Sequence, residues 1–445
     1  MKKAAAFLSL GCKVNSYETE AMRGMFEAAG YDIVDFKEMA DVYVVNTCTV
    51  TNIADRKSRQ MLHQAKKRNP KAIIAAVGCY VQASEEVLLA DSAVDLVVGN
   101  NKKGDIVQMV ERCKDTNEKE ELVLDINEHM EYEELNVITT MEKTRAFIKI
   151  QDGCNRFCSY CIIPYVRGRV RSRKEEEIIS EITELVKKGY KEIVLTGIHI
   201  SSYGSDFSLN DNHSDKINHL GSLIVKIGLI EGLERIRLGS LEPGIITEQF
   251  LTMIQSVKQF CPHFHLSLQS GSDSVLNRMN RKYTSTQYYE RVELIKKFFE
   301  NPAFTTDIIV GFPGETQEEF DETLEFVKKV AFYQIHVFKY SKRAGTKAAD
   351  MKEQVSEEIK NQRSNILISL GEQLSNEYIV CFLGRMERVL FEEEILIEGS
   401  SYQVGHTPRY LKIAVESDQN LSNQMKDVKI CKNLTDEILL CEIMH

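Results

Sequence analysis

The chain has 445 residues, which predicts two to four domains, and its 43% hydrophobic content is ordinary for a globular protein with a large core. The sequence contains no stretch of about 18 apolar residues, the length that a membrane-spanning helix requires. We interpret the short apolar run at residues 4–10 as a buried strand rather than a secretion signal, and therefore expect a cytoplasmic protein. The net charge of −10 excludes a protein that binds polyanions over its whole surface, so any nucleic-acid contact requires local basic patches.

Residues 1–115 alternate between apolar runs and segments with helical spacing. The expected strands are residues 4–10, 42–45, 73–77 and 94–98. This alternation predicts an α/β domain, a doubly wound parallel sheet with helices on both faces. Residues 116–143 are acidic and lack periodicity, so we expect a linker there, with one strand at residues 122–126.

Residues 144–375 repeat the strand and helix alternation. The expected strands are residues 147–151, 192–196, 235–239, 263–268, 305–310 and 335–338, and the expected helices are residues 175–188, 245–258, 284–300 and 318–329. Six such units are too few for a closed eight-stranded barrel and predict a partial (β/α)6 barrel. Residues 208–216 form a polar insertion that we expect to be a surface loop.

Residues 376–445 change to short strands separated by glycines. Residues 389–392, 411–415 and 438–443 predict a small antiparallel β-barrel. This tail carries seven Lys and Arg residues against twelve Asp and Glu residues. Contact of the tail with RNA would require Arg385, Arg388, Arg409 and Lys412 on one face, with Tyr402 or Tyr410 stacked on bases.

Cys154, Cys158 and Cys161 directly follow the first strand of the expected barrel. Their spacing places three thiols in one compact loop, without a fourth Cys or His in the next 30 residues. Structural zinc sites use four ligands, whereas three thiolates on a [4Fe–4S] cluster leave one iron open for a ligand outside the protein. We therefore favour a catalytic cluster over zinc or over unligated thiols.

This motif resembles that of the radical S-adenosylmethionine (SAM) enzymes. The resemblance implies that the open iron binds SAM and that an electron from the cluster cleaves it to methionine and a 5′-deoxyadenosyl radical. It implies that Tyr160 lies against the adenine of SAM, and that Thr196 and Gly197 end the second strand near the SAM amino group. The remaining implied SAM-binding residues follow the third to fifth strands: Glu242, Gln269 and Val310.

Cys12, Cys48 and Cys79 each follow an expected strand of the first domain. In a parallel sheet the carboxyl ends of the strands meet at one edge, so we expect these thiols to gather there, although inert buried thiols remain an alternative on topology alone. The flanking residues (Gly11-Cys12-Lys13-Val14-Asn15, Cys48-Thr49-Val50-Thr51 and Gly78-Cys79-Tyr80) resemble the N-terminal domain of the methylthiotransferases. The resemblance implies a second [4Fe–4S] cluster that binds or supplies sulfur.

Within that group the motifs most resemble the threonylcarbamoyladenosine tRNA methylthiotransferases, and the tail is similar to the RNA-binding TRAM domain. The resemblance implies that a methylthio group is added to C2 of N6-threonylcarbamoyladenosine beside the anticodon of tRNA. In this reading the chemistry belongs to the clusters and to SAM rather than to a catalytic side chain, and the enzyme needs an electron donor and a sulfur source. N6-isopentenyladenosine in tRNA and an aspartate of a ribosomal protein are the alternative substrates, and an iron–sulfur electron carrier or an RNA-binding protein is the non-enzymatic alternative.

Two basic segments lie close to the cysteines in sequence. Arg167, Arg169, Arg171 and Arg173 begin six residues after Cys161, and we expect them to bind RNA phosphates. A second group lies on the expected helix after Cys48: Arg56, Lys57, Arg59, Lys66, Lys67 and Arg68. The other cysteines are expected to be buried or half-buried apolar residues: Cys113, Cys261, Cys381, Cys431 and Cys441.

Overall fold

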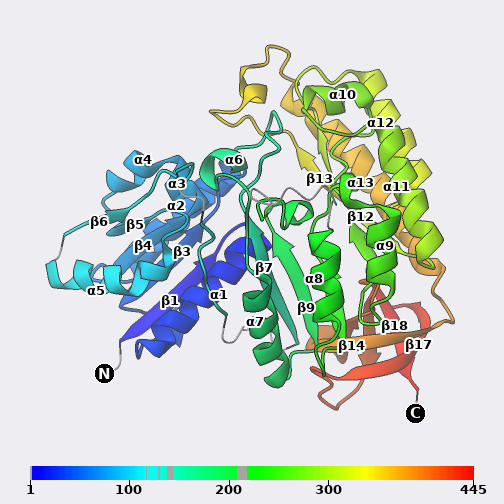
Figure 1. Ribbon diagram of the computed structural model, residues 1–445, viewed down its shortest axis with the longest axis horizontal. Coiled ribbons are helices and arrows are strands. Elements are labelled where there is room, and N and C mark those ends of the chain that lie inside the picture. The colour runs from blue at the N-terminus through cyan, green and yellow to red at the C-terminus, as the bar shows by residue number, and fades with distance from the viewer. Residues whose placement is uncertain (1–2, 117, 129–130, 138–143, 208–217, 445) are drawn as a thin grey trace.

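Three parts of the chain pack against one another in the computed structural model (Figure 1). The structure describes all residues except 1–2, 117, 129–130, 138–143, 208–217 and 445, so the polar insertion and part of the expected linker lie outside the described residues. In the described part of the chain, no helix is long and apolar enough to cross a membrane.

The first part is a six-stranded sheet in which all neighbouring strands are parallel, as predicted. Its order is β2 (Asp32–Val34), β1 (Ala4–Ser9), β3 (Val42–Thr47), β4 (Ile73–Gly78), β5 (Leu96–Val98) and β6 (Glu120–Leu122). The strand expected at residues 122–126 lies instead at β6, which extends the sheet into the expected linker.

Helices cover both faces of this sheet because alternate strand residues point to opposite sides. Ala5, Val42 and Val44 pack beneath one set of helices, whereas Tyr43 and Val45 pack beneath the other. The helices are α1 (Lys13–Ala28), α2 (Asn52–Arg68), α3 (Cys79–Ala83), α4 (Glu85–Leu89) and α5 (Ile106–Thr116).

The second part is an incomplete barrel of six parallel strands, as predicted. Their order is β7 (Arg145–Asp152), β9 (Glu192–Gly197), β10 (Arg235–Leu238), β11 (His263–His265), β12 (Ala303–Val310) and β13 (Gln334–Lys339). β10 and β11 are joined only by isolated bridges, at Ile236 with Phe260 and at Leu241 with Leu266, and the short antiparallel β8 (Arg171–Ser172) extends the edge at β7.

Helices on the outside of the barrel enclose its apolar core. They are α7 (Glu175–Lys187), α8 (His219–Ile227), α9 (Glu248–Gln255), α11 (Ser285–Phe298), α12 (Gln317–Val330) and α13 (Glu357–Val380), with the short helices α6 (Ile163–Val166) and α10 (Asp273–Arg278) in loops. The sequence patterns did not predict α8 or α13. In α13 the apolar Ile359, Ile366 and Ile368 are exposed, so apolar residues do not mark a single face of this helix.

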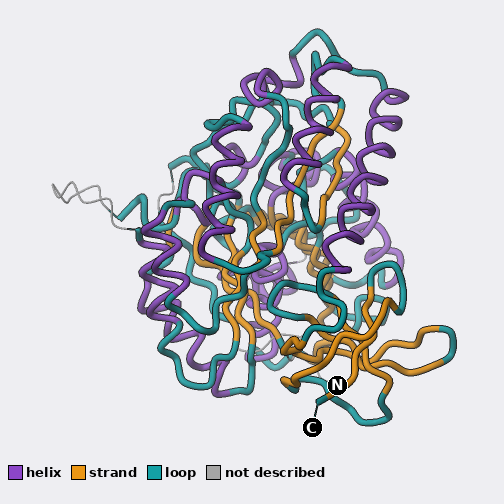
Figure 2. The backbone as a smooth tube through the Cα atoms, turned by 90° about the vertical axis from the view of Figure 1, so that its right-hand side faces the viewer, coloured by secondary structure: helices purple, strands orange, loops and turns teal. Residues whose placement is uncertain are grey.

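The third part is a closed barrel of five strands below the second (Figure 2). The strand order is β14 (Met386–Ile397), β15 (Ser400–His406), β16 (Lys412–Glu416), β18 (Ile438–Ile443) and β17 (Met425–Asn433). Its pairs are antiparallel as expected, except β16 with β18, which are parallel.

The first sheet lies across the open side of the incomplete barrel. Helix α1 contacts β7 and β9 at one edge of the opening. At the other edge Arg343, four residues beyond β13, donates hydrogen bonds to Thr49, Asn52 and Asp55, at 2.6, 2.9 and 2.5 Å. The carboxyl edge of the first sheet therefore faces the interior of the barrel.

Candidate functional site

Cys12, Cys48 and Cys79, the first cysteine set, follow β1, β3 and β4 at the carboxyl edge of the sheet. Gly11 has a φ of +99°, and a Cβ atom there would lie 2.7 Å from the Cys48 Sγ, so only glycine allows this approach. Asn15 links the two loops, since its amide donates to the carbonyls of Leu10 and Thr47, at 2.7 and 3.0 Å. Burial raises the pKa of the Cys48 thiol to about 11, and the charges of Cys79 and Cys12 add to the rise.

The second cysteine set, Cys154, Cys158 and Cys161, occupies the loop between β7 and α6. The Arg156 amide donates to the Cys154 Sγ at 3.4 Å, and the Arg281 guanidinium donates to the Cys158 Sγ at 3.2 Å. Burial raises the pKa of Cys154 to about 11 and that of Cys161 to about 12, with the neighbouring thiols as further causes. Thiols are strong metal ligands in their deprotonated form, so this compact loop could hold a metal centre.

The arrangement of both sets fits an iron–sulfur cluster better than a single metal ion. In the described part of the chain, only His265, Asp307 and His336 form a group of three metal-binding side chains whose ligand atoms all lie within 4.8 Å of one another. The sulfur atoms of each cysteine set are therefore too far apart to surround one ion closely. In a [4Fe–4S] cluster each thiolate binds a different iron, so such a separation is required.

One cavity of about 710 Å³ connects the two sets inside the barrel. It is lined by Cys12 of the first set and by all three cysteines of the second set. This volume lies in the range of ligand-binding pockets. The structure thus brings Cys12 of the first domain to the same cavity as the three thiols of the second.

Four of the six implied SAM-binding residues line this cavity: Tyr160, Thr196, Gly197 and Glu242. Gln269 lines an adjoining cavity of about 230 Å³ that also contacts Tyr160 and Cys161. Val310 lines neither cavity, because its side chain is buried in the barrel core and its carbonyl accepts from the Tyr340 amide.

Glu242 is surrounded by cations in the cavity wall. Its carboxylate lies 2.5 Å from Arg156, 3.3 Å from Arg281 and 3.3 Å from the Nε2 of His199. Burial acts to raise the pKa of Glu242, but the close approach of His199 and the charges of Arg281 and Arg156 outweigh it and lower the pKa to about 2. Glu242 is therefore a fixed negative charge beside the second cysteine set.

The predicted RNA-binding role is wrong for Arg167, Arg171 and Arg173, because their side chains are fully buried. Arg167 donates to Glu18 at 2.8 Å, to Asp152 at 3.1 Å and to the Cys79 Sγ at 3.2 Å. These arginines instead neutralise carboxylates at the junction of the first two parts. Arg173 pairs with Glu181, and Arg171 lies 3.8 Å from Asp152.

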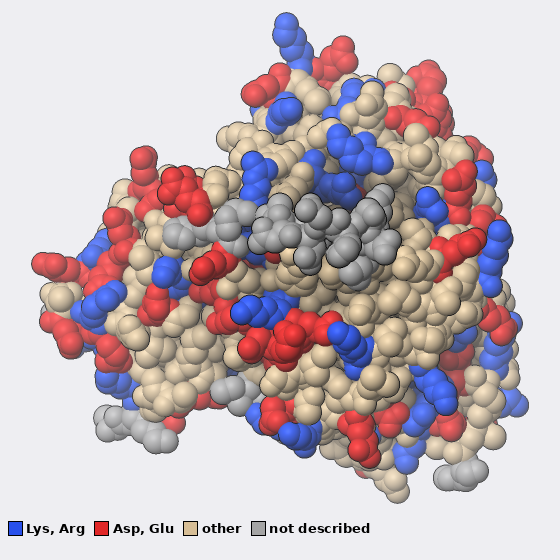
Figure 3. All heavy atoms as spheres, viewed as in Figure 1, with Lys and Arg blue, Asp and Glu red and all other residues tan. Residues whose placement is uncertain are grey.

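Arg169 is the exposed member of that segment. Its guanidinium lies over the Phe157 ring, 4.6 Å from the centroid, and Phe157 contacts the exposed Tyr165 edge to face. On α2, Arg56, Lys57 and Lys67 are exposed, whereas Arg59, Lys66 and Arg68 are bonded to Tyr80, Asp95 and Phe36. Acidic and basic side chains are interspersed over the face seen in Figure 3. Basic groups free to meet phosphate are therefore few in these two segments.

The floor of the cavity comes from the tail, which the sequence patterns did not indicate. Tyr410 stacks on His406 and on His263, with centroids 4.5 and 5.4 Å apart. Arg145 donates to the Tyr410 hydroxyl at 2.9 Å, and Arg237 donates to the carbonyls of the tail at Pro408 and Thr407. Tyr410 is thus engaged by the barrel rather than free to stack on a base.

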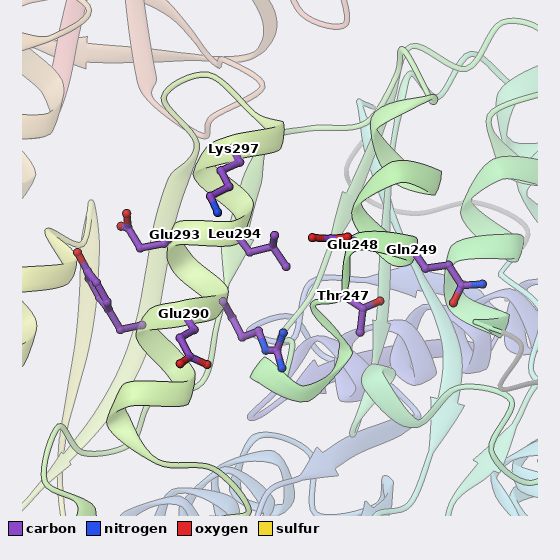
Figure 4. Close-up of a pocket in the computed structure, with 9 residues that line it drawn as sticks. Thr247, Glu248, Gln249, Glu290, Glu293, Leu294 and Lys297 are labelled. Carbon is purple, nitrogen blue, oxygen red and sulfur yellow. The ribbon is translucent and has the colours of Figure 1, made fainter.

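A second large pocket, of about 750 Å³, lies outside the barrel between α9 and α11 (Figure 4). Its described lining consists of Leu294, Tyr289 and polar or charged helix residues, without a cysteine or histidine. It does not meet either cysteine set, so we place the chemistry in the interior cavity.

Two family models match separate parts of the chain. Residues 4–99 match the model of the uncharacterized protein family UPF0004, and residues 148–327 match that of the radical SAM superfamily. A Bacillus subtilis threonylcarbamoyladenosine tRNA methylthiotransferase (MtaB) is 43% identical over 96% of this chain and 93% of its own length. The Aquifex aeolicus protein of the same name is 42% identical over 87% of this chain and 93% of its own.

The chain belongs to the radical SAM tRNA methylthiotransferase family. A family member named for N6-dimethylallyladenosine, from Thermoanaerobacter pseudethanolicus, is 37% identical over 94% of this chain and 88% of its own length. Among solved structures, the radical SAM methyltransferase TsrM from Kitasatospora setae superposes with a TM-score of 0.57, over 78% of this chain and 77% of its own, at 14% identity. That likeness supports the fold of this methylthiotransferase.

Proposed function

We propose that this protein is a threonylcarbamoyladenosine tRNA methylthiotransferase, which adds a methylthio group to C2 of that modified adenosine in tRNA. The observation that carries the proposal is the cavity that Cys12 of the first set shares with all three cysteines of the second set. Its overall similarity to two proteins named for this substrate supports the choice of substrate. A C2–H bond of adenine is beyond the reach of side-chain acids and bases, which is why cofactor chemistry is required.

In this proposal Cys154, Cys158 and Cys161 hold the [4Fe–4S] cluster that binds SAM, and Cys12, Cys48 and Cys79 hold a second one. Bound together, the clusters and SAM supply the radical and sulfur chemistry. The protein holds the cofactors and the base in one cavity, where Glu242 is fixed by its ion pairs with Arg156 and Arg281. Arg167 donates a hydrogen bond to the Cys79 Sγ and so fixes the position of that thiol.

The proposed partners are the anticodon stem-loop of tRNA, an electron donor and a sulfur source, and the proposed location is the cytoplasm. Arg169 and the exposed basic residues of α2 are the candidates for phosphate contact.

The test is nucleoside mass spectrometry of tRNA from a host that lacks 2-methylthio-threonylcarbamoyladenosine and expresses this chain. We expect that nucleoside with the wild type, and its loss with Cys48→Ala and with Cys158→Ala. Purified Cys158→Ala should also lose SAM cleavage, whereas Cys48→Ala should retain it. A 2-methylthio mark on isopentenyladenosine instead would contradict the substrate, and full methylthiolation by Cys48→Ala would contradict the second cluster.

A further inference from the structure

Lys13 is the first residue of α1, and its side chain points into the barrel. It lines the interior cavity together with Cys12, its neighbour in sequence. Its ammonium lies 5.6 Å from the centroid of the Phe147 ring on β7. A cation therefore stands next to the first cysteine set, on the inner side of the cavity.

Lys13 differs from the other Lys and Arg residues that line this cavity. Arg145 pairs with Glu392 and Arg237 with Glu192, whereas Arg156 and Arg281 share Glu242. For Lys13 the structure gives no ion pair and no hydrogen bond to any described residue. Two carboxylates attract it from beyond ion-pair distance, those of Glu192 and Asp307, while Arg145 and Arg237 repel it.

Lys13 is exposed at the cavity surface, so its ammonium is accessible to an anion that enters the cavity. The proposed substrate supplies one, because threonylcarbamoyladenosine carries the free carboxylate of its threonine on N6. C2 and C6 are the two ring atoms bonded to N1 of adenine, and C6 carries N6. A base whose C2 faces the sulfur-bearing side of the cavity therefore also directs its N6 substituent along that side.

Resting on the proposed function, we propose that Lys13 binds the threonine carboxylate of the modified adenosine and so selects this substrate over adenosines with an uncharged N6 group. A charge-assisted hydrogen bond of this kind is stronger than a neutral one. The role is one of positioning and specificity, and the reaction itself remains with the cofactors.

The experiment compares two anticodon stem-loops, one with threonylcarbamoyladenosine and one with its threonine carboxamide, using the reconstituted full-length enzyme. Lys13→Gln should lower kcat/KM for the carboxylate substrate about 10- to 100-fold and leave that for the carboxamide within about threefold of the wild type. Lys13→Arg should keep most of the preference. Arg23→Gln removes a cation that pairs with Glu20 on the same helix and is the matched control.

Iron and sulfide content must be equal in all variants, and equilibrium binding of the two stem-loops gives a readout independent of turnover. Equal losses on both stem-loops, or an unchanged carboxylate preference in Lys13→Gln, would overturn the proposal. The wild-type arm separates this from failure of the proposed function, since a wild type that methylthiolates neither stem-loop contradicts the function itself.

Discussion

At the scale of single residues, two arginines that lie two positions apart in the sequence differ completely in solvent exposure. Arg167 is buried against Glu18, Asp152 and Cys79, whereas Arg169 is exposed on the Phe157 ring. A segment of alternating arginines therefore divides into residues that hold the protein together and one residue that can meet RNA.

The first prediction concerns this pair. Arg167→Ala leaves buried carboxylates without their partner and should lower the free energy of unfolding by about 3 kcal/mol or more. Arg169→Ala should change it by less than about 0.5 kcal/mol, yet weaken tRNA binding and reduce its salt dependence by roughly one counterion. Urea unfolding and tRNA titration at several salt concentrations measure both effects. Equal unfolding midpoints for the two variants would refute the assignment.

The second prediction concerns Gly11. Its φ of +99° and the 2.7 Å approach to the Cys48 Sγ leave no space for a methyl group. Gly11→Ala should displace the first cysteine set and lower the iron content from about eight to about four atoms per chain. SAM cleavage should persist, because the second set lies on another loop. Gly24→Ala, where a Cβ atom meets nothing within 4 Å, is the control.

At the scale of elements, strand β9 begins with the buried Glu192, which gathers three arginines at the barrel floor. Arg237 donates to it at 2.9 Å, and Arg235 and Arg145 lie at 3.5 and 3.9 Å. Burial acts to raise the pKa of Glu192, but these arginines outweigh it and lower the pKa to about 2.

The third prediction follows from that pKa. A carboxyl whose pKa falls on folding stabilises the protein above its unfolded pKa near 4.5, and the stabilisation disappears as the pH falls toward 2. A shift of this size corresponds to about 3 kcal/mol. In cluster-free protein, the difference in unfolding free energy between wild type and Glu192→Gln should therefore shrink between pH 4.5 and pH 2. A difference that stays constant over this range would contradict the depressed pKa.

The strands that precede Cys12, Cys48 and Cys79 could be predicted, because each is a short apolar run that ends shortly before its cysteine. Parallel strands then require a shared edge, and this reasoning located the first cysteine set. The burial of Arg167 could not be predicted, since Glu18 lies 149 residues away in the chain. A run of arginines in the sequence looks the same whether it forms a solvated loop or a buried network of ion pairs.

The burial of the remaining cysteines was predicted only in part. Cys381 and Cys431, expected to be at least half-buried, are exposed, whereas Cys113, Cys261 and Cys441 are buried as expected.

At the scale of the whole molecule, the tail closes the barrel. Arg235 donates to the carbonyls of His406 and Arg388, at 2.7 and 2.5 Å, and Arg409 donates back to Asn301 and Glu300 of the barrel. Tyr410 completes the junction between His263 and His406. Arg409, one of the basic residues of an otherwise acidic tail, thus has a structural role at this junction.

The fourth prediction tests this closure. Tyr410→Phe keeps the ring stack but loses the hydrogen bond from Arg145, and should destabilise the protein by about 1 kcal/mol. Tyr410→Ala also loses the stack and should destabilise it by about 2–3 kcal/mol. Thermal unfolding measures both, with Tyr402→Ala as a control on the same small barrel. If Tyr410→Ala lowered tRNA affinity without lowering stability, Tyr410 would be an RNA-stacking residue after all.

The placement of the first sheet across the open barrel limits how this architecture can be recombined. Two arginines of the barrel part cross the junction, since Arg167 reaches Glu18 and Arg343 reaches Asp55 of the first part. A chimera that joined the first sheet of one methylthiotransferase to the barrel of another would replace one partner of each of these contacts. It would also place the residue at position 13 of one protein against the cavity of the other. The sheet and the barrel should therefore be exchanged between family members only together, and substrate preference and cluster geometry should be transferred with them.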